Sequence, residues 1–169
     1  MIVSAFAGTG KTSFTEKYPH VCVDLDSSLF GKDENGNRNA NFVDDYVKAI
    51  AEHADSSKIV FISTHVEVLD AIAQQLQLPV TIIIPDNHLV DEYMLRYRNR
   101  NNNPEFIDKM YESWDSWLDK LKNRPDTAVI VLQSGQYVSD VIKIDENLSQ
   151  EHRQLNNALM RLSNQYKEV

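Results

Sequence analysis

The stretch Ala5-Phe-Ala-Gly-Thr-Gly-Lys-Thr12 decides the fold of this chain of 169 residues. We call it the phosphate loop, because it matches the pattern G-x-x-x-x-G-K-[ST] except that Ala5 replaces the first glycine. That departure is mild, since the position only has to be small at the end of a strand. The apolar run 1–6 precedes the loop and a helical pattern over 11–17 follows it. A chance match in a surface turn would not have this strand–loop–helix context.

Each residue type in the phosphate loop has a chemical reason. Gly8 and Gly10 allow bends that point successive N–H groups at one phosphate. Lys11 brings a positive charge to the β- and γ-phosphates, Thr12 offers a hydroxyl to Mg²⁺, and the following helix directs its positive end at the anion. The motif therefore predicts a site for ATP and Mg²⁺. Its predicted nucleotide-binding residues are Ala7, Gly8, Thr9, Gly10, Lys11, Thr12 and Ser13.

Apolar runs alternate with helical patterns along the chain, which is typical of an α/β domain with a mainly parallel sheet. We predict one domain over 1–169 with the three-layer P-loop NTPase fold, helices on both faces of a five-stranded sheet, and a lid-like helical insertion at about 88–122. Trp114 and Trp117 belong to the core stripe of that insertion. The strands are expected at 1–6, 20–25, 58–63, 79–84 and 128–132. The helices are expected at 11–17, 42–50, 66–76, 89–100, 106–121 and from about 149.

Composition and charge exclude several classes of protein. With 25 acidic and 17 basic residues the net charge is −8, which disfavours nonspecific binding to nucleic acid or anionic membrane. No stretch approaches the ~18–20 apolar residues of a transmembrane helix, and no basic-then-apolar leader opens the chain. The single Cys22 cannot form an internal disulfide, so we expect a reducing cytoplasm. The sequence leaves the oligomeric state open.

Two carboxylates, Asp24 and Asp26, close the second predicted strand. Ligands bind at the carboxyl ends of parallel strands, and the alternation of side chains puts both aspartates on the same side. One carboxylate could hold Mg²⁺ through water, while the other accepts the proton of an attacking hydroxyl. The alternative is that one of them caps the turn with Ser27 or Ser28.

The phosphate loop, short helix, strand and D-x-D together resemble the small P-loop kinases, such as shikimate kinase and the nucleoside monophosphate kinases. The resemblance is close over residues 1–30 and loose over the alternation of five strands with helices. In the shikimate kinase type the two aspartates bind magnesium and the acceptor, which implies Asp24 for the metal and Asp26 for the acceptor. The segments SSLF, STHVEV and YRNRN are also similar to small phage-encoded proteins described as nucleoside or nucleotide kinases.

The run Ser63-Thr64-His65 ends the third predicted strand and is expected at the same edge of the sheet. P-loop proteins often carry a metal-binding aspartate at this point, and here Asp24 is expected to replace it. His65 could contact an acceptor phosphate or orient a hydroxyl. The alternative is that Ser63 or Thr64 is simply the N-cap of the following helix.

Three arginines fall where the nucleoside monophosphate kinases have a lid that delivers arginines to the phosphates. Forked guanidiniums stabilise the charge that phosphoryl transfer spreads over oxygens. Arg96 and Arg100 share one helix face whereas Arg98 points roughly opposite, so the first two are the predicted pair; the alternative is a solvated basic face. The same resemblance places the loop after the fifth strand beside adenine, which implies Gln136 and Tyr137 there.

These observations predict a phosphotransferase that moves the γ-phosphoryl group of ATP to a small acceptor. By resemblance the acceptor is a nucleoside monophosphate, with a nucleoside or a polynucleotide 5′-hydroxyl next. The missing aspartate after the third strand keeps open a second class, a nucleotide-binding module that turns over slowly or not at all. A GTPase is disfavoured, because there is no N-K-x-D. The predicted catalytic residues are Lys11, Asp26, Arg96 and Arg100, the acceptor residues Asp26, His65 and Arg96, and the metal ligands Thr12 and Asp24.

Overall fold

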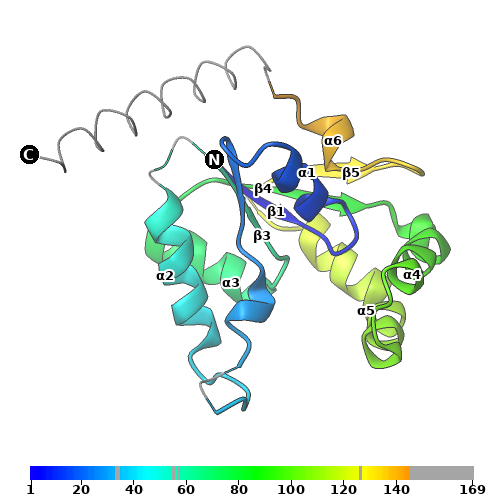
Figure 1. Cartoon of the computed structure of the whole chain (residues 1–169), viewed down its shortest axis with the longest axis horizontal. Coiled ribbons are helices and arrows are strands. Elements are labelled where there is room, and N and C mark those ends of the chain that lie inside the picture. Colours follow the sequence, from blue (N-terminus) through cyan, green and yellow to red (C-terminus); the bar gives the residue numbers. More distant parts are fainter. Residues whose placement is uncertain (33–34, 55, 57, 126, 145–169) are drawn as a thin grey trace, which may run out of the picture.

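The computed structural model describes residues 1–32, 35–54, 56, 58–125 and 127–144. Its centre is one sheet of five parallel strands in the order β2-β3-β1-β4-β5 (Figure 1). The predicted α/β class is therefore confirmed. The strands are β1 (Ile2–Ala5), β2 (Cys22–Asp24), β3 (Ile59–Ile62), β4 (Val80–Pro85) and β5 (Ala128–Leu132).

Helices connect all consecutive strands, as crossovers in a parallel sheet require. The helix predicted over 66–76 is α-helical only as far as Ala71 and continues as a π turn to Leu76. The helices are α1 (Lys11–Lys17), α2 (Phe42–Ala54), α3 (Val66–Ala71), α4 (Val90–Asn99), α5 (Pro104–Lys122) and α6 (Val138–Val141). The short turns are η1 (Ser27–Leu29), η2 (Ile72–Leu76) and η3 (Asn87–Leu89).

Both faces of the sheet are covered, which explains why the predicted strands have continuous apolar runs. Successive strand residues point to opposite faces. Val3 and Ala5 of β1 therefore pack with Phe14 of α1 and Val138 of α6, while Ile2 joins the larger cluster completed by α2, α3, α4 and α5. Figure 1 shows α1 and α6 on one side of the sheet and α2, α3 and α5 on the other. This arrangement confirms the three predicted layers.

The predicted insertion at about 88–122 forms a hairpin of α4 and α5. Trp114 of α5 is buried, and its Nε1 donates to the Asn87 carbonyl at 2.7 Å. Its ring lies against those of Phe6 and Tyr93, with centroid distances of 5.5 Å and 5.3 Å. The prediction that Trp114 belongs to the core is confirmed, and the hairpin is packed onto the same core as the sheet.

Several element ends differ from the prediction by a few residues, and one helix was not predicted. Pro85, expected to stop the fourth strand, is its last residue, and the N–H of Asp86 continues the ladder to the Leu132 carbonyl. Helix α6 was not predicted, because four residues are too few to show a helical period. The helix predicted from about Ser149 lies outside the described residues. Within the described ranges, no helix combines the length and apolar character needed to cross a membrane.

Candidate phosphate-binding site

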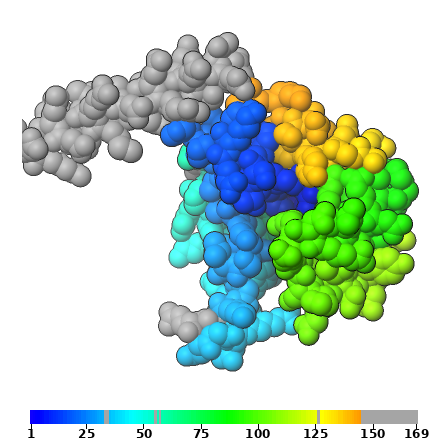
Figure 2. All heavy atoms as spheres, turned by 45° about the vertical axis from the view of Figure 1, so that its right-hand side comes forward, coloured from blue at the N-terminus to red at the C-terminus, as the bar shows by residue number. Residues whose placement is uncertain are grey.

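The strands of a parallel sheet all end at the same edge, and the phosphate loop follows the central strand β1 there. The chain leaves β1 toward β2 on one side and leaves β4 toward β5 on the other. A reversal of this kind is where ligands bind in open α/β sheets. Figure 2 shows the dark-blue residues of the phosphate loop and α1 lying between the light-blue segment that follows β2 and the green α4.

The phosphate loop has the backbone bends that its glycines permit. Gly8 and Gly10 have φ angles of +80° and +91°, in the region that favours glycine. Thr9 between them is buried, and its hydroxyl donates to the Phe6 carbonyl at 2.7 Å. The N–H of Phe14 donates to the Gly10 carbonyl at 3.0 Å and begins α1. The loop and helix are therefore continuous, as the motif predicts.

Lys11 lies along the inside of the phosphate loop. Its Nζ donates to the Ala5 carbonyl at 2.6 Å and to the Phe6 carbonyl at 3.3 Å. Burial lowers the pKa of Lys11 to about 8; the charge of Asp24 acts in the opposite direction and that of Arg100 lowers it further. The ammonium group thus shares its surroundings with a carboxylate and a guanidinium of the predicted site.

Thr12 and Asp24 are adjacent, as the predicted metal site requires. Thr12 Oγ1 donates to Asp24 Oδ2 at 3.0 Å, while the other carboxylate oxygen, Oδ1, is buried and has no hydrogen-bond partner. Mg²⁺ prefers oxygen ligands and usually keeps waters and substrate phosphates beside one or two carboxylates, so this pair fits a magnesium ion. Among the described residues, no group of three His, Cys, Asp or Glu could hold a metal by itself. Ser13, the next predicted residue, is exposed on α1.

Asp26 lies beyond the end of β2 with an exposed side chain. Its Oδ1 accepts the N–H of Ser28 at 2.9 Å, which makes Asp26 the N-cap of η1. The alternative that one aspartate caps this turn is therefore confirmed for Asp26. The same carboxylate raises the pKa of Lys11, so its charge also acts on the phosphate loop.

The ends of β2 and β3 are joined by Tyr46, which sequence analysis did not place in the site. Its buried hydroxyl donates to the Leu25 carbonyl at 2.6 Å and accepts the N–H of Ser63 at 3.1 Å. The sequence shows Tyr46 only as a member of the apolar stripe of α2 and gives no sign of what its hydroxyl binds. These bonds fix the two strand ends relative to each other.

His65 is the N-cap of α3, without a side-chain hydrogen bond to the helix. The alternative that Ser63 or Thr64 caps this helix is therefore wrong. The His65 ring contacts the Phe42 ring edge-on, with the centroids 5.1 Å apart. Partial burial lowers the pKa of His65, and the charge of Lys109 on α5 lowers it further against the influence of nearby Glu67. His65 and Lys109 are thus close enough for their charges to interact.

The three predicted arginines have different surroundings. Arg96 is largely buried; its Nη1 donates to the Gly8 carbonyl at 3.0 Å and its Nη2 to the Gln136 carbonyl at 3.1 Å. Arg98 and Arg100 are exposed, and the charge of Arg100 reaches Lys11. Both members of the predicted pair therefore lie beside the phosphate loop, but the guanidinium of Arg96 is bonded to backbone carbonyls.

The segment after β5 packs directly on the phosphate loop. The N–H of Val138 donates to the Thr9 carbonyl at 2.9 Å. A Cβ added at Gly10 would lie 3.1 Å from Cδ1 of Tyr137, so the close approach also needs a glycine. The side-chain oxygen of Gln136 accepts the N–H of Gln133 at 2.8 Å. The structure thus brings the two residues predicted beside the base, Gln136 and Tyr137, to the phosphate loop.

Three residues of α4 also belong to this site and were not predicted. The Tyr97 hydroxyl donates to the Ala7 carbonyl at 3.0 Å, and the Tyr93 ring lies against Gly8. Glu92 forms an ion pair with Arg96. The spacing of four residues between Glu92 and Arg96 is the signal that could have found this pair.

No protein-family model and no curated protein matches the chain.

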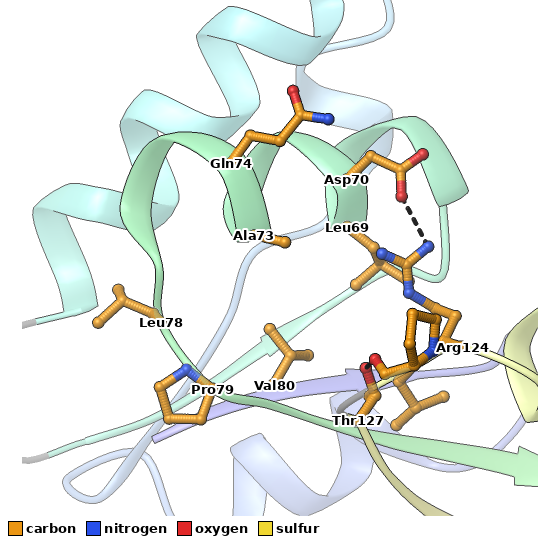
Figure 3. A pocket seen from close by; sticks show the side chains of 11 residues that line it. Leu69, Asp70, Ala73, Gln74, Leu78, Pro79, Val80, Arg124 and Thr127 are labelled. Atoms are coloured by element: carbon orange, nitrogen blue, oxygen red, sulfur yellow. Dashed lines mark hydrogen bonds and ion pairs between the residues drawn. The ribbon is translucent and has the colours of Figure 1, made fainter.

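A separate cavity of about 350 Å³ lies at the opposite edge of the sheet, between η2, α3 and the amino ends of β4 and β5 (Figure 3). Asp70 and Arg124 form an ion pair of 2.8 Å at its wall. None of the predicted site residues lines this cavity, so it is distinct from the phosphate-loop site. Its lining includes Leu69, Ala73, Leu78, Pro79, Val80 and Thr127.

Proposed function

We propose that this chain is an ATP-dependent phosphotransferase that moves the γ-phosphoryl group to a small acceptor, a nucleoside monophosphate above others. The observation that carries the proposal is the contact between Thr12 and Asp24 beside the Lys11 ammonium, at the end of a glycine-bent loop. Such a loop presents N–H groups and a lysine to phosphates. The threonine hydroxyl and the carboxylate add two oxygens for magnesium.

The side chains divide the work of transfer between them. Bound magnesium would neutralise charge on the phosphates. An acceptor oxygen forms a bond to the γ-phosphorus while the bond to the β-phosphate oxygen breaks, and ADP leaves. Lys11 and the exposed Arg100 supply positive charge as negative charge moves between these oxygens. Asp26 orients the acceptor, or takes the proton where the acceptor is a hydroxyl.

Positive charge on the acceptor side supports a phosphate-bearing acceptor. Lys109 acts on His65, and the exposed Arg100 acts on Lys11, so the charges of two cations of the α4–α5 hairpin reach residues at the carboxyl edge of the sheet. An acceptor phosphate would interact with this charge, whereas an uncharged nucleoside would not. A polynucleotide acceptor needs a longer basic surface, and the net charge of −8 does not favour one.

The second candidate is a nucleotide-binding module that does not transfer phosphate. One observation favours it, namely that three of the four predicted catalytic residues bond backbone groups, among them Lys11, which bonds the Ala5 and Phe6 carbonyls. Asp26 caps η1, and Arg96 bonds the carbonyls of Gly8 and Gln136. Such a module would bind ATP or ADP without consuming ATP when an acceptor is added.

The test is transfer from γ-labelled ATP and Mg²⁺ to separate pools of nucleosides, nucleoside monophosphates and 5′-hydroxyl oligonucleotides. Label should enter the monophosphate pool, disappear with Lys11→Ala, and persist with Lys48→Ala, which removes an exposed lysine of α2. Label in one of the other pools would instead assign that class of compound as the acceptor. Binding of ATP without transfer in any pool would contradict the kinase and favour the binding module.

A further inference from the structure

The face of α4 that meets the phosphate loop carries an ion pair between Glu92 and Arg96. Nη2 of Arg96 lies 2.5 Å from Oε1 of Glu92, one helical turn away, and the side chain of Arg96 is 10% exposed while that of Glu92 is 26% exposed. An ion pair at the surface contributes little, but here both partners also bond the segment after β5, and Arg96 bonds the phosphate loop as well. The pair therefore connects parts of the chain that are distant in sequence.

Arg96 holds the phosphate loop on one side and the segment after β5 on the other. Its two terminal nitrogens donate to the carbonyls of Gly8 and Gln136. Its guanidinium carbon lies 4.5 Å from the ring centroid of Tyr93 and 4.0 Å from that of Tyr137, an arrangement in which a cation is attracted to the aromatic ring. Hydrogen bonds and rings thus fix this side chain in one position.

Glu92 holds the same segment after β5 through its carboxylate. It accepts the Ser134 hydroxyl at 2.8 Å and the Gly135 N–H at 3.1 Å. Partial burial would raise the pKa of Glu92, but the hydrogen bonds from Ser134, Gly135 and Arg96 hold it below its ordinary value. The carboxylate is therefore stabilised in its charged form, as the ion pair requires.

We infer that Glu92 and Arg96 are positioning residues, which hold the phosphate loop and the segment after β5 together in the shape that receives the nucleotide. This inference rests on the proposed function, because it concerns the same nucleotide site. The peptide unit is planar, so fixing the Gly8 carbonyl also fixes the direction of the Thr9 N–H. A loop held in place before binding loses less freedom when the phosphates bind. Arg96 thus acts through the loop, while Arg100 remains exposed.

The first experiment measures ADP affinity by calorimetry in the presence of Mg²⁺. Arg96→Ala should weaken binding by about tenfold or more, the equivalent of losing hydrogen bonds from a charged donor. Arg98→Ala, which removes an exposed arginine of the same helix, should leave it within about twofold. Arg96→Lys keeps the charge beside Glu92, so its melting temperature should be closer to that of the wild type than that of Arg96→Ala. A lysine lacks the planar fork that donates to two carbonyls, so ADP binding should stay weak.

Steady-state kinetics separate positioning from catalysis. Arg96→Lys should raise the KM for ATP and leave kcat at saturating ATP nearly unchanged, because the lost interaction organises the site before chemistry. A large fall in kcat with an unchanged KM for ATP would overturn the inference, since that is the result expected for an arginine that contacts the transferred group.

Hydrogen exchange tests the pair without any nucleotide. The amides of Gly135 and Val138, which bond Glu92 and the Thr9 carbonyl, should exchange faster in Arg96→Ala and Glu92→Ala than in Arg98→Ala. If these amides exchange at the wild-type rate in both variants, the positioning role is wrong. If they exchange faster but the wild type does not bind ADP, the positioning holds and the proposed function fails.

Discussion

The phosphate loop is bonded from two sides, by α4 and by the segment after β5. Asp26 at the end of β2 instead caps its own turn, and His65 at the end of β3 makes a ring contact with Phe42 but no side-chain hydrogen bond to α3. Arg96 and Tyr97 donate to carbonyls of the loop, and Val138 donates to a third. Asp26 bonds Ser28 two residues away and is exposed. The phosphate loop and the elements bonded to it, which we call the bonded half of the carboxyl edge, are therefore organised before a ligand binds. The ends of β2 and β3, with Asp26 and His65, are the open half.

This difference is what a phosphotransferase with a fixed donor site and an adaptable acceptor site requires. Phosphates of every nucleotide are alike, so the surfaces that bind them can be organised in advance at low entropic cost. An acceptor is recognised by groups that must stay free to bond it. The open half contains the Asp26 carboxylate and the His65 imidazole, and the charge of Lys109 acts on the imidazole.

The largest effect that separates the two halves is expected for Asp26→Asn. The amide oxygen can still accept the Ser28 N–H and cap η1, so only the negative charge is lost. Phosphoryl transfer should fall by about 100-fold, because the acceptor is no longer oriented or deprotonated. Parallel assays of transfer and ATP binding check this, with binding expected within about twofold of the wild type.

Asp44→Asn is the matched control, since Asp44 is an exposed aspartate in the first turn of α2. It should leave both quantities unchanged. Equal losses of ATP binding and transfer in Asp26→Asn would show that Asp26 belongs to the bonded half. The proposed division of the carboxyl edge into two halves would then be wrong.

On the bonded half, Gly8→Ala should weaken ADP binding by about tenfold or more. The added Cβ would lie 3.0 Å from Cε1 of Tyr97, and the φ angle of +80° already disfavours alanine. Either the loop or α4 has to move. Calorimetric titration with ADP measures the effect.

Gly36→Ala provides the comparison, because Gly36 has the same φ of +80° but nothing within 4 Å of an added Cβ. It should lower the free energy of unfolding by about 1–2 kcal/mol through backbone strain and leave ADP affinity unchanged. A similar loss of affinity in both variants would mean that a general effect of backbone strain on the fold, rather than the approach of Tyr97, accounts for the loss in Gly8→Ala.

The sequence predicts the bonded half only where its functional groups form a contiguous motif. Residues 5–12 are such a motif, and the apolar runs along the chain identify the strands, so the loop and the sheet could be predicted. The partners of Arg96 are backbone carbonyls of Gly8 and Gln136, 88 and 40 residues away. Every residue has a backbone carbonyl, so the sequence does not show which carbonyls Arg96 bonds. No pattern could therefore show that Arg96 bonds the backbone and is not free to bind a phosphate.

The open half was ambiguous for a different reason. Asp26 follows a strand and precedes two serines, which suits both a turn cap and an acceptor ligand, and the structure shows that it makes the cap. The role of Tyr46 depends on where the ends of β2 and β3 lie relative to α2, which is a property of the assembled fold. The acceptor depends on the shape of that assembled edge, and no local motif encodes it.

A smaller effect is expected for Tyr46→Phe, which removes the hydroxyl that joins the two strand ends. The Leu25 carbonyl and the Ser63 N–H would each lose a partner, so the free energy of unfolding should fall by about 1–3 kcal/mol. Urea denaturation measures this, with Tyr111→Phe on exposed Tyr111 as the control. The KM for the acceptor should rise more than the KM for ATP. A larger rise in the KM for ATP would assign Tyr46 to the bonded half.

The smallest effect concerns the charge of Lys11 within the bonded half. Burial lowers its pKa from 10.5 to about 8, so between these values the unfolded chain holds a proton that the folded chain has released. The unfolding free energy of the wild type relative to Lys11→Met should therefore rise with pH from about 8 to 10.5 and be flat below about 8. Denaturation of both proteins across this range measures the difference.

Nucleotide binding should respond to the same proton with the opposite trend. A phosphate is attracted to the charged form of Lys11, so ADP affinity should fall by about fourfold between pH 7 and pH 8.5 as that form is depleted. Calorimetry in two buffers of different ionisation enthalpy should also detect proton uptake on binding above pH 8. Lys11→Met should bind weakly at every pH and take up no proton. A wild-type affinity that stays constant across this range would mean that the Lys11 ammonium remains bonded to the Ala5 and Phe6 carbonyls and does not turn toward the phosphates.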